Sequence, residues 1–165
     1  MVEDLGADPQ RAADIDFTEP YVEIEATYLV PAGSPIKTIG EVDRKGVRIA
    51  VAGRSAYDLW LTRNIKNAEL VRGDSIGGSY QLFVREKLEV LAGLKPKLLE
   101  DVTKLPGSRI LEGRFTAVNQ AIGTPRGRPA GAAYLKQFAE DIKASGLVAQ
   151  LIERHNVRGL SVAKK

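Results

Sequence analysis

The sequence predicts an α/β fold built around a mostly parallel sheet. Strand-like and helix-like segments alternate through the middle of the chain, and a connection between parallel strands is usually a helical crossover. Glycine and proline separate these segments at short intervals. Of the 165 residues, 44% are hydrophobic and 27% are charged. This is the composition of an ordinary globular protein with enough apolar surface for a core.

The elements follow from the local pattern. Apolar and polar residues alternate over 21–30, which predicts a half-buried strand. Thr38 can cap a short helix after the proline-rich segment that ends this strand. Residues 47–52 form the next strand, Gly53 closes it, and Ser55 can cap the helix that follows. Further strands are expected at 69–71, 88–92, 109–111 and 115–122, and further helices at 79–87, 97–105, 130–145 and 147–155.

The last two helices have no strands of their own to cover. They carry an apolar stripe at helical spacing, which must be buried against something. The chain therefore leads us to expect a partner for this face. The stripe consists of Tyr134, Leu135, Phe138, Ile142, Leu147 and Leu151.

Composition excludes several kinds of chemistry. Without cysteine there is no disulfide, thiolate metal site or cysteine nucleophile, and the single His155 cannot build a multi-histidine zinc site. No serine triad order, Walker loop, Gly-x-Gly-x-x-Gly or HExxH motif occurs. We therefore expect no catalytic residues, no metal and no cofactor.

Charge and hydropathy indicate which partners and which cellular locations to expect. The 24 Lys and Arg and the 21 Asp and Glu are interleaved and leave a net charge of +3, so we expect no nucleic-acid partner. No apolar run approaches the ~18 residues that cross a bilayer. The first ten residues are acidic and lack the features of a secretory signal, which predicts either a cytosolic protein or a trimmed sequence.

One segment has the form of an anion site. Gly53, Arg54, Ser55 and Ala56 follow a strand and open a helix, so free N–H groups and the Ser55 hydroxyl can meet a ligand. Open α/β sheets bind ligands at the carboxyl ends of their strands. An ordinary capped helix explains the same residues equally well.

Other polar residues have weaker patterns. Arg11 suits either a surface carboxylate or a ligand. Glu23 and Glu25 share one face of the first strand. They are either paired acids for glycosidic chemistry or the solvated face of this strand. His155 lies at a helix end, where the dipole favours a cation. Trp60 and Phe83 occupy apolar helical positions and are expected in the core.

Five segments taken in order resemble a known family. They are DPQRAADIDFTEPY at 8–21, LVPAGSPIKTI at 29–39, GVRIAVAGRSA at 46–56, AIGTPRG at 121–127, and the helices at 138–152 around KASG. In this order they resemble the bacterial extracellular solute-binding proteins of family 3, the amino-acid receptors of ABC transporters. The resemblance covers about residues 8–163 and lacks the family's opening segment.

The resemblance implies a periplasmic-binding-protein type 2 fold with a complete second lobe and a partial first lobe. Residues 1–30 would be a remnant of lobe one with the first hinge strand. Residues 31–118 would be the second lobe, and 119–165 the returning hinge strand with the C-terminal helices of lobe one.

The function implied by the resemblance is capture of a small carboxylate-bearing solute between two lobes, for delivery to a membrane ABC permease. The parent protein would be periplasmic and not an enzyme. Arg11 stands where the family's arginine clamps the ligand carboxylate, and Ser55 with the Ala56 N–H where the second lobe completes that clamp. Gly6 falls near the first-lobe ligand loop, while Arg54 and Gly93 are expected to face the cleft.

The sequence departs from the family at one place. Gly93, Leu94 and Lys95 stand where the family has an ammonium-binding aspartate. Either the ligand is a carboxylate without a free ammonium, or another acid supplies the contact.

Two alternatives stay open. The first is a cyclohexadienyl or arogenate dehydratase-like enzyme, for which Asp74 and Glu112 are the candidate proton donors. The second is a truncated fragment that binds no solute and self-associates, as a homo-oligomer, through its exposed helices.

Overall fold

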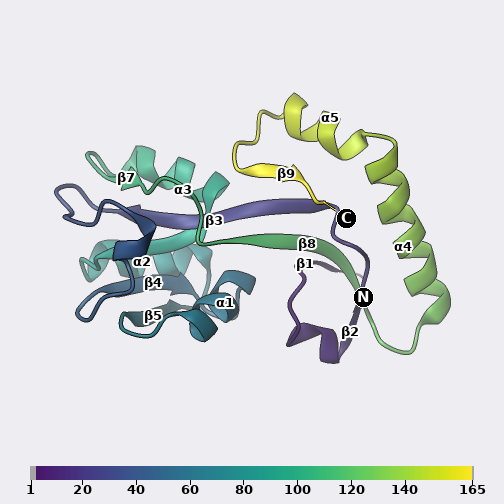
Figure 1. Ribbon diagram of the computed structural model, residues 1–165, viewed down its shortest axis with the longest axis horizontal. Coiled ribbons are helices and arrows are strands. Elements are labelled where there is room, and N and C mark those ends of the chain that lie inside the picture. The colour runs from purple at the N-terminus through teal and green to yellow at the C-terminus, as the bar shows by residue number, and fades with distance from the viewer. Residues whose placement is uncertain (1–2, 165) are drawn as a thin grey trace. The chain divides into compact units, whose positions relative to one another are not determined.

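The computed structural model describes residues 3–164, with residues 1, 2 and 165 of the predicted lobe-one segments outside the described part. The chain divides into two compact units (Figure 1). Unit 1 comprises Met1–Ile24 and Val118–Lys165, and unit 2 comprises Glu25–Ala117. Two long strands, β3 (Val22–Val30) and β8 (Thr116–Pro125), carry the chain from one unit into the other.

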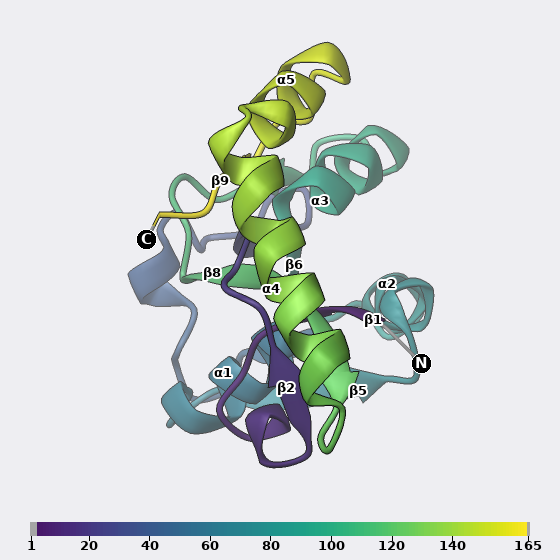
Figure 2. The same cartoon turned by 90° about the vertical axis from the view of Figure 1, so that its right-hand side faces the viewer.

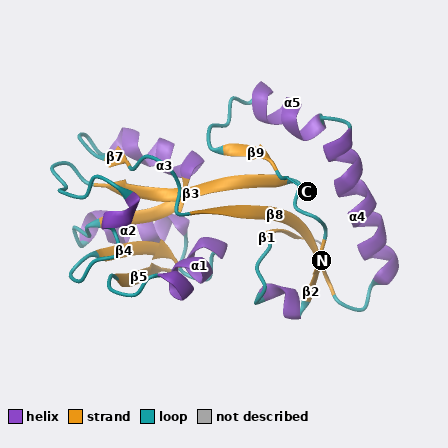
Figure 3. Ribbon diagram, viewed as in Figure 1, coloured by secondary structure: helices purple, strands orange, loops and turns teal. Residues whose placement is uncertain are grey.

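Unit 2 contains a mixed sheet with a parallel centre (Figure 3). Strand β4 (Arg48–Ala52) pairs in parallel with β5 (Glu69–Gly73) and with β6 (Val90–Leu94). Strand β3 pairs antiparallel with β6 and with the short β7 (Arg109–Ile110). The helices α1 (Ala56–Asn64) and α2 (Ile76–Arg85) form the two crossovers. The predicted α/β class is therefore confirmed.

Shorter elements complete unit 2. Helix α3 (Lys95–Asp101) follows β6 without a loop and runs into the 3-10 helix η3 (Val102–Lys104). The predicted helix after Thr38 is a single 3-10 turn, η2 (Ile39–Glu41). The sequence predicted a strand at 88–92 and a helix at 97–105, but β6 continues to Leu94 and Pro96 lies in the first turn of α3. Proline is well accommodated there, because first-turn N–H groups have no partner within the helix.

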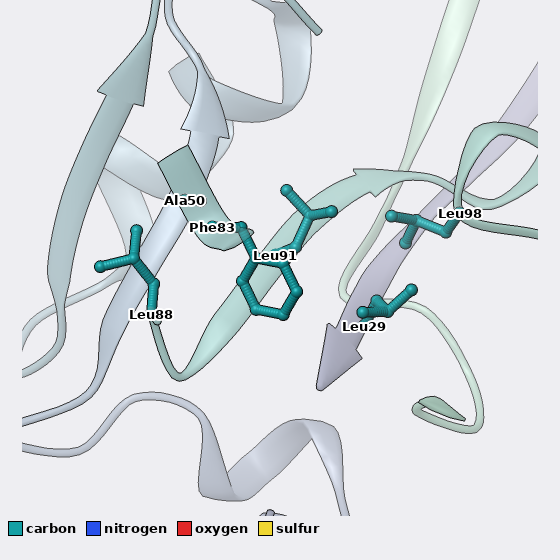
Figure 4. Packing of buried hydrophobic residues seen from close by; sticks show 6 residues of the cluster. All are labelled: Leu29, Ala50, Phe83, Leu88, Leu91 and Leu98. Atoms are coloured by element: carbon teal, nitrogen blue, oxygen red, sulfur yellow. The ribbon is translucent and has the colours of Figure 1, made fainter. Parts of the chain in front are cut away.

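The core of unit 2 lies between its sheet and its helices (Figure 4). Phe83 of α2 is only 4% exposed and confirms its predicted place in the core. Trp60 is half-buried in a separate aromatic contact with Phe115, whose ring stacks on Tyr28 at 4.4 Å. Burial raises the pKa of the Tyr28 hydroxyl well above its usual range. The main cluster consists of Leu29, Ala50, Phe83, Leu88, Leu91 and Leu98.

Unit 1 contains the start of β3, up to Ile24, and β8 from Val118 onward. Strands β1 (Glu3–Gly6) and β2 (Ile15–Phe17) pair antiparallel with β8, and β9 (Leu160–Val162) pairs antiparallel with the start of β3. The 3-10 helix η1 (Arg11–Ala13) joins β1 to β2. A Cβ on Gly123 of β8 would lie 2.7 Å from the Ile15 Cγ2, so only glycine allows β2 to pack this closely.

Helices α4 (Pro129–Ala144) and α5 (Leu147–Arg154) follow β8 in unit 1 (Figure 2). Gly146, with φ +76°, separates them. Their only buried residues are Ala139 and Val148. Four members of the predicted apolar stripe are exposed: Tyr134 by 71%, Phe138 by 44%, Leu147 by 43% and Leu151 by 43%. None of the helices in the described part of the chain is long and apolar enough to cross a membrane.

Candidate functional site

The turn between β4 and α1 in unit 2 positions the first group of candidate residues. Gly53 ends the strand and donates its N–H to the Gly73 carbonyl at 2.9 Å. Arg54 takes a left-handed conformation with φ +64°, which costs a residue with a Cβ about 1–2 kcal/mol. Ser55 then caps α1, and its Oγ accepts the Asp58 N–H at 3.1 Å. The predicted serine cap is confirmed.

The cap leaves the first amides of α1 available. Within the described residues, neither the Ala56 N–H nor the Tyr57 N–H donates a hydrogen bond. Free amides of a helix start attract anions, through the N–H groups themselves and through the helix dipole. Tyr57 is buried beneath this turn, where burial raises the pKa of its hydroxyl and a hydrogen bond with Ser55 opposes the rise.

The buried carboxylate of Asp58 accepts a hydrogen bond from the turn between β4 and α1. The Asp58 side chain is only 5% exposed, and its Oδ2 accepts the Arg54 N–H at 2.8 Å. Arg72 of β5 donates from Nε to the Asp58 Oδ1 at 3.0 Å and from Nη2 to the Thr62 Oγ1 at 2.8 Å. Sequence reasoning missed Asp58 and Arg72, because only the parallel pairing of β4 with β5 brings them together.

Gly93 lies in β6 and is packed on one side by α3. A Cβ at this position would lie 3.0 Å from the Leu98 Cδ2. Two residues further on, the Lys95 Nζ donates to the Glu25 Oε2 of β3 at 2.6 Å. An ion pair between Lys95, the first residue of α3, and Glu25 of β3 thus lies directly after β6.

The two candidate proton donors of unit 2 follow other strands. Asp74 comes directly after β5, is exposed, and accepts the Ser75 hydroxyl at 3.0 Å. Glu112 follows β7 and is also exposed. No cluster of three or more possible metal-ligating side chains occurs among the described residues.

Unit 1 brings Arg11 and Gly6 together. Arg11 begins η1, and its Nη1 donates to the Gly6 carbonyl at 2.9 Å. Asp8, which is 6% exposed, holds the intervening loop, because its Oδ1 accepts the Gln10 N–H at 2.9 Å and its carbonyl accepts the Arg11 N–H at 3.0 Å. The buried Gly6 is itself fixed by pairing with Gln120 of β8. The guanidinium is thus attached to the edge of β1.

Arg126, just beyond β8, holds η1 from its other end. Its Nη2 donates to the Ala12 carbonyl at 2.6 Å, and its backbone N–H donates to the Asp14 carbonyl at 3.3 Å. Arg126 and Ala12 are 114 positions apart in the sequence, which explains why no local pattern could reveal this contact.

The sequence comparison identifies the family. The sequence profile of the bacterial extracellular solute-binding proteins, family 3, matches residues 1–157. The chain belongs to this family. The resemblance inferred from the five sequence segments is therefore confirmed. No curated protein matches the chain.

Solved structures of solute-binding proteins share the fold. A solute receptor for L-cysteine from Neisseria gonorrhoeae aligns with TM-score 0.81 and 18% identity over 97% of this chain and 68% of its own. The putative binding component of an ABC transporter from Wolinella succinogenes, complexed with lysine, aligns with TM-score 0.77 and 20% identity over 92% of this chain and 66% of its own.

A third structure links binding to catalysis. An ancestral amino acid-binding protein, described as a precursor of cyclohexadienyl dehydratase, aligns with TM-score 0.73 and 18% identity over 91% of this chain and 65% of its own. At such identities the likeness establishes the fold, which is the predicted type 2 periplasmic-binding-protein fold. This family member spans about two thirds of the length of these structures.

Proposed function

We propose that this chain is the solute-binding component of a bacterial ABC transporter and captures a small carboxylate-bearing polar solute, an amino acid or a related organic acid. Family membership over residues 1–157 is the observation that carries the proposal. In this proposal unit 2 corresponds to the second lobe of the family and unit 1 to part of the first. The protein works outside the cytoplasm, in the periplasm, and delivers the solute to a membrane permease.

The chemistry of two segments supports a carboxylate as the common group of the solute. Arg11 offers the planar guanidinium that pairs bidentately with a carboxylate. Ser55 and Ala56 offer a hydroxyl and a free amide at the start of α1. A carboxylate taken out of water needs such charge-assisted donors to offset its desolvation.

The end of β6 favours a solute without a free ammonium group. Lys95 places a positive charge directly after the strand, and Glu25 is already paired with that lysine. A protonated amine there would meet a cation, with no acid left over from this pair. Dicarboxylates and keto acids are therefore preferred over α-amino acids.

A dehydratase of the cyclohexadienyl or arogenate type is the second candidate, because one structural neighbour is described as the precursor of such an enzyme. Its candidate proton donors are Asp74 and Glu112 of unit 2, which are both exposed. Incubation of the chain with prephenate or arogenate tests this candidate directly, since product formed faster than in buffer would place catalysis ahead of binding.

A thermal-shift screen against amino acids, dicarboxylates and keto acids tests the binding proposal. A ligand at a hundredfold excess over its dissociation constant stabilises the native state by about 2.7 kcal/mol. For a chain of this size that corresponds to a rise in midpoint of roughly 5–10 °C.

Two variants test whether a shift in the screen depends on Arg11. Arg11→Ala should abolish the shift, whereas Arg154→Ala, which removes an exposed arginine of α5, should retain it. A shift that survives in Arg11→Ala would contradict the assigned role of Arg11. No shift with any compound would contradict solute capture by this chain.

A further inference from the structure

Asp58 places a buried carboxylate close to the amides that are proposed to bind an anion. It lies in the first turn of α1, where a carboxylate interacts well with the helix dipole but repels a second anion that approaches the same amides. A binding protein for carboxylates therefore gains nothing from this charge unless something compensates it. The proposed function of the turn makes this compensation necessary, and the inference rests on that proposed function.

Arg72 provides the compensation. Its Nε lies 3.0 Å from one carboxylate oxygen of Asp58 and 3.3 Å from the other. Its Nη2 is held by the Thr62 Oγ1, whose hydroxyl in turn donates to the Asp58 carbonyl at 2.8 Å. Hydrogen bonds to Asp58 and Thr62 of α1 thus fix the guanidinium beside the carboxylate.

Asp58 in turn fixes the main chain. Its Oδ2 accepts the N–H of Arg54, the residue in the left-handed conformation, while the Asp58 N–H donates to the Ser55 Oγ. These two bonds tie both residues of the turn to Asp58, Arg54 through the Asp58 carboxylate and Ser55 through the Asp58 backbone N–H. They also set the direction in which the free amides of Ala56 and Tyr57 point.

We propose that Asp58 and Arg72 are a positioning pair for the turn of residues 53–56: Asp58 shapes the turn, and Arg72 cancels its charge so that the amides of α1 can accept a carboxylate. Neither side chain touches the ligand in this proposal. Both act through the backbone of Arg54, Ser55 and Ala56.

The charges predict an order of affinities that a purely structural role does not. Arg72→Gln leaves an uncompensated carboxylate and should weaken anion binding about tenfold or more, as expected for like charges a few ångströms apart in a partly buried site. Asp58→Asn keeps an acceptor oxygen for the Arg54 N–H but removes the charge, so binding should be retained or strengthened. The double variant should recover affinity to within about threefold of the unsubstituted chain.

Titration with sodium acetate tests this order, with the amide shifts of Ala56 and Tyr57 followed by 15N–1H NMR on the full chain. Sodium chloride at equal ionic strength controls for screening. Arg48→Gln is the matched control, because it breaks the Arg48–Glu89 ion pair at the opposite end of β4. It should leave acetate binding unchanged.

Each outcome decides the matter. Recovery in the double variant supports the positioning pair, whereas additive losses in Asp58→Asn and Arg72→Gln, or equal affinity in all four proteins, would overturn it. Unresponsive amides in the unsubstituted chain would also overturn it. A chain that binds acetate in the predicted order but no larger solute would instead defeat the proposed function and leave the positioning pair standing.

Discussion

Gly73→Ala tests how closely α2 packs on the end of β5. A Cβ at Gly73 would lie 2.4 Å from the Ser79 N and 2.7 Å from the Gly78 carbonyl carbon and the Ser79 Cα. All three are backbone atoms, so no side chain can rotate away and α2 itself must shift. Overpacking a core typically costs ~1–3 kcal/mol, and three such contacts place this variant near 3 kcal/mol.

Urea unfolding followed by the fluorescence of Trp60, the single tryptophan, measures this cost within unit 2. With a slope of about 2 kcal/mol per molar urea, a loss of about 3 kcal/mol lowers the midpoint by about 1.5 M. Gly77→Ala is the control on the same helix, since nothing lies within 4 Å of a Cβ there. It should be neutral or stabilise by about 0.5 kcal/mol. Equal midpoints for Gly73→Ala and the unsubstituted chain would refute the packing argument.

Two further predictions concern acid stability and association. Burial would raise the pKa of the Asp43 carboxyl, but N–H donors of Ala68, Asn67 and Lys66 outweigh it and hold this pKa below its usual 3.8. The stabilisation is present above about pH 4 and is lost as pH falls through the lowered pKa, so Asp43→Asn should unfold with a flatter acid dependence; identical profiles would argue against it. The exposed Tyr134 and Phe138 predict self-association in light scattering. The double variant Tyr134→Ser with Phe138→Ser should scatter as a smaller species. If the unsubstituted chain is a monomer at every concentration, the prediction is contradicted.

Local patterns were enough to predict the parallel centre of unit 2. Glycine closes β4 and β5, and serine caps both following helices. The Ser55 cap was predicted, whereas the helix expected at 79–87 begins at Ile76, after a Ser75 cap that the sequence analysis did not identify. The predicted end of the strand at 88–92 was wrong, because glycine usually separates elements but Gly93 lies inside β6. Its role is instead to make room for Leu98 inside a strand.

The candidate site was only partly accessible from sequence. Ser55 and Ala56 were found because a cap and its helix are contiguous, and Arg11 because a family motif surrounds it. The Asp58–Arg72 pair depends on the register of β4 and β5, and the Arg126–Ala12 contact on the pairing of β2 with β8. Such contacts arise from tertiary structure and leave no periodic signal in the chain. Carboxylate capture itself stays a prediction.

Native mass spectrometry tests that central claim most directly. The chain would be incubated with a mixture of amino acids, dicarboxylates and keto acids, transferred into volatile buffer, and compared with Arg11→Ala treated in the same way. The account predicts one carboxylate-bearing solute retained by the unsubstituted chain and absent from the variant. Retention of no solute by the unsubstituted chain, or of the same solute by both proteins, would contradict it.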